Sequence, residues 1–226
     1  MTAVFAFPDA AKVGNRVPRD TLFRRAGGGK TIRALYEAEV ERVDWAFKLF
    51  DRSINLPAAS DVREIQVFRV RLRGRELDDR VLAHIDRAVP QLTWFEVERT
   101  TLDRPEVQVA AAYKRRSDAD SAAQVTHAHW RSAWIAADAP RAALPPAIAL
   151  DALYAGMLRA LWPHPARPSE TLRSHAERLS KAAAQAKAVA RLEGQVQRER
   201  DFARQIEANR ALRAARETLR ELTDPA

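Results

Sequence analysis

The sequence predicts an α+β fold: a mixed, mostly antiparallel sheet of about five strands with flanking helices, followed by a long C-terminal helical, coiled-coil extension. Several central segments alternate apolar and polar residues with the period of a strand, whereas the last quarter of the chain has a helical period. Three prolines, Pro163, Pro165 and Pro168, separate the two regions. We therefore divide the 226 residues into a basic N-terminal arm (1–33), an α/β domain (34–168) and a C-terminal helical coiled-coil region (169–224).

The first 29 residues show no sustained period and are interrupted by prolines and by the Gly27-Gly28-Gly29 run. Residues 1–33 carry seven basic and two acidic side chains, a net charge of +5 out of +8 for the whole chain. We interpret them as an arm or irregular layer. A helix is expected to begin at Thr31, which is a suitable N-cap residue.

The central elements follow from their periods. In residues 43–49, Val43, Trp45, Phe47 and Leu49 share one face of a strand. The next strand, 62–73, changes phase between Val67 and Phe68, which predicts a bulge. The remaining elements are a helix over 78–89 that ends at Pro90, antiparallel strands over 92–97, 107–113 and 124–130, and a helix over 148–161.

Beyond Ser169 no proline or turn signal occurs before Pro225, so the sequence predicts one helix of about 54 residues, roughly 80 Å long. The alternative is a helical hairpin that bends near Gly194 and packs on the domain. Near-heptad spacing selects the positions expected to pair with a second copy or a partner: Leu172, Leu179, Val189, Val196, Ile206, Leu212, Leu219 and Leu222. A phase change around residues 207–209 favours bent or short-segment pairing over a uniform homodimeric coiled coil.

Composition limits the protein class. The absence of cysteine excludes disulfides and thiolate zinc sites and favours a reducing compartment. No secretory signal and no membrane-spanning apolar run is present, so we expect a soluble, cytoplasmic protein without a membrane partner. The pI near 10.4 is compatible with nucleic-acid binding.

Basic residues in the arm and along one strand are the candidates for phosphate contact. They are Arg16, Arg19, Arg24, Arg25, Lys30, Arg69, Arg71 and Arg73. The alternative is that they form a solvated face and a subunit-docking arm.

Two candidate chemical sites depart from their patterns. Gly27-Gly28-Gly29-Lys30-Thr31 ends like a phosphate-binding loop, but Arg24 stands where that loop begins with glycine. His127 and His129 have a metal-ligand spacing but no evident third ligand. We therefore expect no catalytic residues, no metal and no cofactor.

A nuclease is the enzyme alternative. The element order, with Asp44 and with Glu64 two residues before Gln66, is similar to a restriction-endonuclease core, in which acidic residues hold Mg²⁺ beside a lysine. The lysine position holds Gln66, so Lys48 would have to supply the cation.

Several segments together resemble a bacterial family known only as a domain of unknown function, whose members are often encoded beside restriction-type helicases and DNA methyltransferases in phage-defence loci. The matching segments are Asn15–Arg19, Val43–Leu49, Ile54–Leu56, Glu64–Phe68, Ile85–Pro90, Ala112–Lys114, Trp130 with Trp134, and Arg198–Phe202 running on to Asn209. The resemblance implies genomic context, not catalytic residues. It leads to the hypothesis of a non-catalytic accessory subunit of a defence or restriction-modification complex, with a helicase or methyltransferase of the same locus as partner and a homo-oligomer or DNA contacts as further possibilities. The alternatives are a divergent metal-dependent nuclease and a stand-alone DNA-binding protein.

Overall fold

The computed structural model describes residues 3–59, 61–102, 104–116 and 124–224. The chain forms two compact units, Met1–Trp162 and Pro163–Ala226. The division between the units falls before the proline-rich segment, at residue 163, whereas the sequence-based division was placed after it, at residue 169. None of the helices in the described part of the chain is long and apolar enough to cross a membrane.

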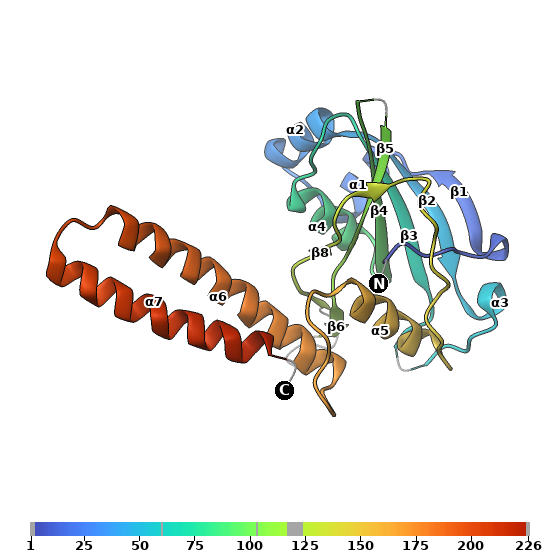
Figure 1. The fold of residues 1–226 in the computed structure, drawn as a ribbon. Coiled ribbons are helices and arrows are strands. Elements are labelled where there is room, and N and C mark those ends of the chain that lie inside the picture. The colour runs from blue at the N-terminus through green and yellow to red at the C-terminus, as the bar shows by residue number, and fades with distance from the viewer. Residues whose placement is uncertain (1–2, 60, 103, 117–123, 225–226) are drawn as a thin grey trace. The chain divides into compact units, whose positions relative to one another are not determined.

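Figure 1 labels the helices and strands in chain order. The first unit contains a 3-10 turn Asp9–Ala11, β1 Lys12–Arg16, α1 Arg19–Ala26, α2 Lys30–Glu39, β2 Val40–Leu49, α3 Asp51–Ile54, β3 Ile65–Leu72, α4 Asp79–Ala88, β4 Leu92–Thr101, β5 Arg104–Ala111, β6 Lys114–Arg116, β7 Gln124–Thr126, β8 Trp130–Arg131, β9 Ile135–Ala136 and α5 Leu150–Leu161. The second unit contains α6 Leu172–Arg198 and α7 Phe202–Thr223.

The main sheet confirms a mixed, mostly antiparallel arrangement. Its strand order is β1-β2-β3-β4-β5-β8, and β9 also pairs with β5. Strands β3 and β4 are parallel because α4 crosses from the end of one to the start of the other, whereas the other described pairs of this sheet are antiparallel. The strand expected over residues 124–130 is divided: β7 forms a separate hairpin with β6, and β8 joins the main sheet.

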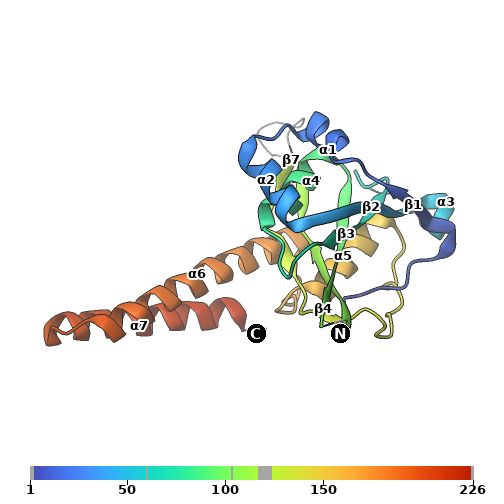
Figure 2. The ribbon, with the colours of Figure 1, turned by 90° about the horizontal axis from the view of Figure 1, so that it is seen from above.

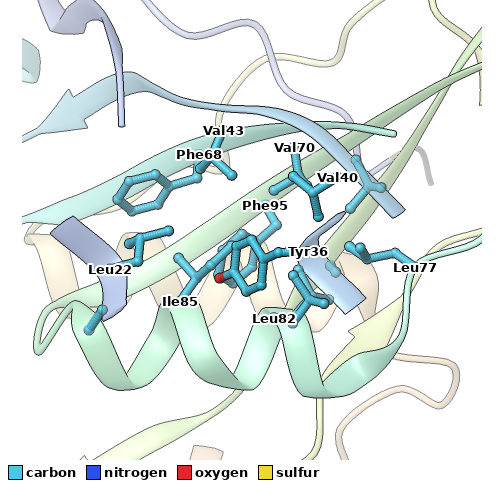
Figure 3. Close-up of a cluster of buried hydrophobic side chains, with 14 of the residues drawn as sticks. Leu22, Tyr36, Val40, Val43, Phe68, Val70, Leu77, Leu82, Ile85 and Phe95 are labelled. Atoms are coloured by element: carbon cyan, nitrogen blue, oxygen red, sulfur yellow. The ribbon is translucent and has the colours of Figure 1, made fainter. Parts of the chain in front are cut away.

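One hydrophobic core lies between the sheet and helices α1, α2 and α4, while α5 covers the opposite face (Figures 1 and 2). Helix α4 begins where the side chain of Asp78 accepts a hydrogen bond from Arg80 N at 2.9 Å, and it ends just before Pro90. Figure 3 shows Leu82 and Ile85 of α4 beside Phe95 of β4. All three side chains are completely buried, so this amphipathic helix fixes the crossover to the sheet.

Residues 1–33 do not form a separate arm. Strand β1 pairs with β2, and Leu22 and Phe23 of α1 are buried in the core. His84 of α4 joins these elements, because its ring contacts the Tyr36 hydroxyl at 3.0 Å and the Gly27 carbonyl oxygen at 2.7 Å. A carbonyl can only accept, so His84 Nε2 carries a proton and donates to Gly27.

The Gly27-Gly28-Gly29 run is the turn between α1 and α2, and Gly29, not Thr31, is the N-cap of α2. Gly28 has a φ of 137°, and a Cβ atom there would lie 2.7 Å from the Phe23 ring. Only glycine fits this close approach.

The predicted bulge lies in β2 instead of β3. The register shifts between Trp45 and Phe47, opposite Phe68 and Val67. Residues Ile65 to Phe68 of β3 are all buried, because both faces of the sheet are covered there. The change of phase in the sequence therefore reflects burial on both faces.

The second unit is an antiparallel helical hairpin, and the expectation of one continuous helix is wrong (Figure 1). The turn comprises residues 199–201, later than the expected bend near Gly194. Thr171 caps α6 by accepting a hydrogen bond from Ser174 N, and Asp201 caps α7 by accepting one from Arg204 N.

Candidate nucleic-acid interface

A cluster of basic side chains surrounds the end of β1 and helix α1. We define the basic corner as Arg16, Arg19, Arg24, Arg25, Lys30 and Arg73. Four of these residues line two adjoining hollows that share Arg16, Val17 and Pro18 as a common wall.

The first hollow, of about 570 Å³, is the more polar one. Arg16, Arg19, Arg42 and Arg73 line it together with two acidic side chains, Asp20 and Glu41. The second hollow, of about 350 Å³, has Arg16 and Arg25 in its lining and reaches β3 and the end of α4. Below, this second hollow is called the β1–α4 hollow.

Backbone contacts hold the basic corner against the sheet. Val17 N donates to the Val43 carbonyl at 2.9 Å, and the Arg19 guanidinium donates to the carbonyl of Val40. Helix α1 packs on α4. The basic corner is therefore part of a folded surface, which lowers the conformational entropy that a ligand must remove on binding.

The predicted phosphate-binding residues fall into two groups. Within the described residues, the side chains of Arg16, Arg25 and Lys30 make no ion pair or hydrogen bond, and Arg24 donates only to the Thr21 hydroxyl, at 3.2 Å.

Arg69 and Arg71 differ, because the parallel register of β3 and β4 places them beside glutamates. Arg69 Nε lies 2.8 Å from Glu96, and Arg71 lies 3.6 Å from Glu98. Arg141 also contacts Glu96, at 2.5 Å, so that this fully buried carboxylate joins three parts of the chain. Arg69 and Arg71 therefore form ion pairs with glutamates of the neighbouring strand β4.

The four residues of the nuclease alternative do not form one site. Lys48 and Gln66 are paired across β2 and β3, and Glu64 contacts both, at 2.5 Å from Lys48 Nζ and 2.7 Å from Gln66 Nε2. In the register of β2 and β3, Asp44 lies opposite Arg69. Arg69 is three residues from Gln66 on β3, so Asp44 and Arg69 lie on the face of the sheet opposite to Lys48 and Gln66. Asp44 contacts Arg42 at 2.5 Å.

A buried charged cluster around Asp86 was not predicted from the sequence. The carboxylate of Asp86 in α4 lies 2.7 Å from Lys114 Nζ and 2.7 Å from His129 Nε2 and accepts a hydrogen bond from the Thr93 hydroxyl. A sequence signal exists, since Asp86 follows Ile85 on the apolar face of an amphipathic helix. Burial alone would raise the pKa of Asp86, but the His129 hydrogen bond and the Lys114 charge outweigh it, so the pKa is lowered and the group stays ionised.

His129 is therefore a partner of Asp86. The ring centroid of His127 lies 5.4 Å from that of Tyr113. Among the residues that the structure describes, no three His, Asp or Glu side chains are grouped so as to hold a metal ion.

Comparison with known families covers nearly the whole chain. A family model described as a domain of unknown function, DUF4391, matches residues 5–219. The chain belongs to the DUF4391 family. The match includes the basic corner, the buried Asp86 cluster and most of the helical hairpin. No curated protein and no solved structure matches the chain.

The DUF4391 match extends through the positions predicted to form an interaction helix. Leu179, Val189 and Leu212 are buried, and α6 packs along α7. Leu172, Val196, Leu219 and Leu222 are partly buried. Ile206 is 54% exposed, and Phe202, one turn earlier, is 76% exposed.

Arg178 of α6 links the segment before α6 to the end of α7 in this DUF4391 chain. Its guanidinium donates to both carboxylate oxygens of Glu170, at 2.8 and 2.9 Å. It also donates to the carbonyls of Leu222 at the end of α7 and of Pro165. The hydrogen bond from Arg178 is the main cause that lowers the pKa of Glu170 to about 2.

This pKa predicts acid sensitivity of the hairpin. A carboxylate with a lowered folded-state pKa contributes its full stability above its ordinary pKa of 4.5 and loses that stability as the pH falls toward 2. We expect the thermal stability of the hairpin, followed by circular dichroism, to decline between these pH values. The decline should be weaker in Glu170→Gln but unchanged in Glu177→Gln, whose carboxylate pairs with Arg173 on the surface. Identical pH profiles for Glu170→Gln and wild type would contradict the assignment.

Proposed function

We propose that this DUF4391 chain is a non-catalytic accessory subunit of a bacterial defence or restriction-modification assembly, and that it contacts nucleic-acid phosphates through the basic corner. The observation that carries the proposal is that Arg16, Arg25 and Lys30 lack intramolecular partners in the described chain, although Arg69 and Arg71 have them. Unpaired, exposed arginines on a rigid surface suit bidentate contacts with phosphate.

The arrangement around Glu64 supports the non-catalytic part of this proposal. Both oxygens of Glu64 are engaged, one by Lys48 and one by Gln66, and Asp44 lies on the other face of the sheet. A two-carboxylate Mg²⁺ site would require both acids to face one point.

The helical hairpin is the part that we assign to protein contact. Exposed Phe202 and Ile206 lie beside its turn, and large apolar side chains at exposed positions are typical of docking surfaces. We propose a helicase or methyltransferase of the same locus as the partner.

The salt dependence of DNA binding tests the proposal. We expect the full chain to bind a duplex oligonucleotide without sequence preference, with an affinity that falls as salt rises, as measured by fluorescence anisotropy. Arg16→Ala combined with Arg25→Ala removes two phosphate contacts, so the slope of log affinity against log salt should become shallower by about 1.8, or about 0.9 for each contact.

A matched control removes the same charge elsewhere. Arg104→Ala combined with Arg159→Ala alters two exposed arginines on β5 and α5 and should leave the slope unchanged. The proposal fails if both double variants shift the slope equally, or if wild type does not bind at low salt. Cleavage of the oligonucleotide in Mg²⁺ would overturn its non-catalytic part.

A further inference from the structure

We propose that the β1–α4 hollow holds a single nucleotide, with the base inside and its phosphate at Arg16 and Arg25. The inference deepens the proposed function, because it assigns to the basic corner a specific subsite for one nucleotide unit. It rests on the shape of the hollow, on two buried polar atoms without partners and on an uncompensated charge at the mouth.

The hollow has the size and lining of a small-ligand site. Its volume is about 350 Å³, within the range of roughly 300–1,000 Å³ that such sites occupy. Apolar and aromatic side chains form half of the lining: Val17, Pro18, Leu22, Trp45, Phe68, Ala88 and Val89. A flat, largely apolar ring can cover such a surface, and aromatic side chains favour stacking with it.

Two polar groups in the wall lack partners. Gln66 is 4% exposed, and its Nε2 donates to Glu64, whereas its Oε1 accepts no hydrogen bond. Trp45 Nε1, also buried, donates none. Buried polar atoms are nearly always paired, so one free acceptor and one free donor in the same wall point to a ligand with a complementary edge. A nucleobase edge carries both donors and acceptors.

The charge at the mouth selects an anion. Glu64 is the acidic residue of the lining, and its contacts with Lys48 and Gln66 compensate it. Arg16 and Arg25 are exposed and have no counter-ion among the described residues. A fatty acid would leave Gln66 and Trp45 unpaired, and inorganic phosphate would leave the apolar wall uncovered. A phosphorylated heterocycle satisfies all three features.

Such a nucleotide has two sources, a free mononucleotide or an unstacked or terminal nucleotide of a strand. Isothermal titration of the full chain with the four 5′-mononucleotides, the matching nucleosides, inorganic phosphate and a short 5′-phosphorylated single strand distinguishes them. We expect binding of at least one mononucleotide or of the single strand, and at least ten-fold weaker binding of the nucleosides and of phosphate. Mononucleotide binding equal to that of the strand assigns a free nucleotide, and much tighter strand binding assigns a strand nucleotide.

Two variants locate the ligand. Gln66→Met keeps the side-chain length but removes the polar atoms, and Thr21→Phe fills the hollow from the surface of α1. Each should weaken nucleotide binding at least ten-fold while leaving the salt slope for duplex DNA unchanged. Thr21→Phe serves as the test if Gln66→Met does not fold.

The outcomes separate this inference from the proposed function. Wild-type nucleotide affinity in a folded Gln66→Met or Thr21→Phe variant would overturn the inference, and so would duplex binding with no binding of any nucleotide or strand. Nucleotide binding that depends on Gln66, together with no affinity for duplex DNA, would support the inference and overturn the proposed function.

Discussion

Asp86→Asn is expected to destabilise the first unit by about 3–5 kcal/mol, because it removes one partner of a buried charge pair. The Lys114 side chain is completely buried, and burial already lowers the pKa of its ammonium group. Without Asp86 it would have to carry an unpaired charge or release its proton, and either costs stability. Its remaining contacts are backbone carbonyls, including those of Val89 and Gln91 at 3.2 and 2.9 Å. Carbonyl dipoles only partly compensate an ammonium group in a low-dielectric interior.

The loss should extend beyond the cluster itself. Asp86 connects α4 to Thr93 at the start of β4 and to His129 just before β8, so the cluster joins the crossover to the far edge of the sheet. Urea unfolding followed by tryptophan fluorescence measures the change. Asp79→Asn is the matched control, because Asp79 lies on the same helix and pairs with Arg131 at the surface, with 70% of its side chain exposed. A loss no larger than that of the control would show that the buried cluster contributes little.

Arg178→Ala is expected to open the helical hairpin. The side chains of Arg178 and Glu170 are 6% and 9% exposed, and breaking such a pair costs about 3–5 kcal/mol. The carbonyls of Leu222 and Pro165 would lose their donor as well. Two helices joined by an alanine-rich seam have little apolar area to offset this loss.

Hydrogen exchange of residues 172–223 and helicity by circular dichroism measure the opening. Arg173→Ala removes an exposed arginine that pairs with Glu177 one turn away, and it should leave exchange unchanged. Arg178→Lys should behave like Arg178→Ala, because an ammonium cannot reproduce the forked contact with both carboxylate oxygens. Protection equal to wild type in Arg178→Ala would exclude a structural role for this contact.

The sequence predicted those elements that contribute many apolar residues to the core. Helix α4 has a clear helical period, and strands β2 to β5 are apolar segments of strand length, β3 and β4 being buried on both faces. Strand β1 has no such period, since none of its five residues is buried, and α1 contributes only Leu22 and Phe23 to the core. For that reason residues 1–33 resembled an arm. The turn between α6 and α7 lacks glycine and proline, and its one signal is the capping residue Asp201.

The residue types of the candidate site could be predicted from the sequence, but the residues that they contact could not. Asp44 and Lys48 are four apart and would share a face of a regular strand, but the register shift before Phe47 places them on opposite faces. Arg69 and Arg71 looked available because only the parallel pairing of β3 with β4 shows their glutamate partners. No local pattern shows that Lys114 and His129 meet Asp86, because these contacts span 28 and 43 residues.

The pairing of Phe5 with Ala142 has a consequence for the order in which the chain folds during synthesis. Ala6 N donates to the Ala142 carbonyl at 2.8 Å, and Ala142 N donates to Val4 at 2.9 Å. Phe5, 3% exposed, lies 5.6 Å from the Trp94 ring. At about 5–20 residues per second, the ribosome needs roughly 7 to 27 seconds to supply residue 142 after residue 5. Through that interval Val4 and Ala6 lack their hydrogen-bond partner. Residues 4–6 therefore cannot be held in place over Trp94 by this pairing until residue 142 has been made.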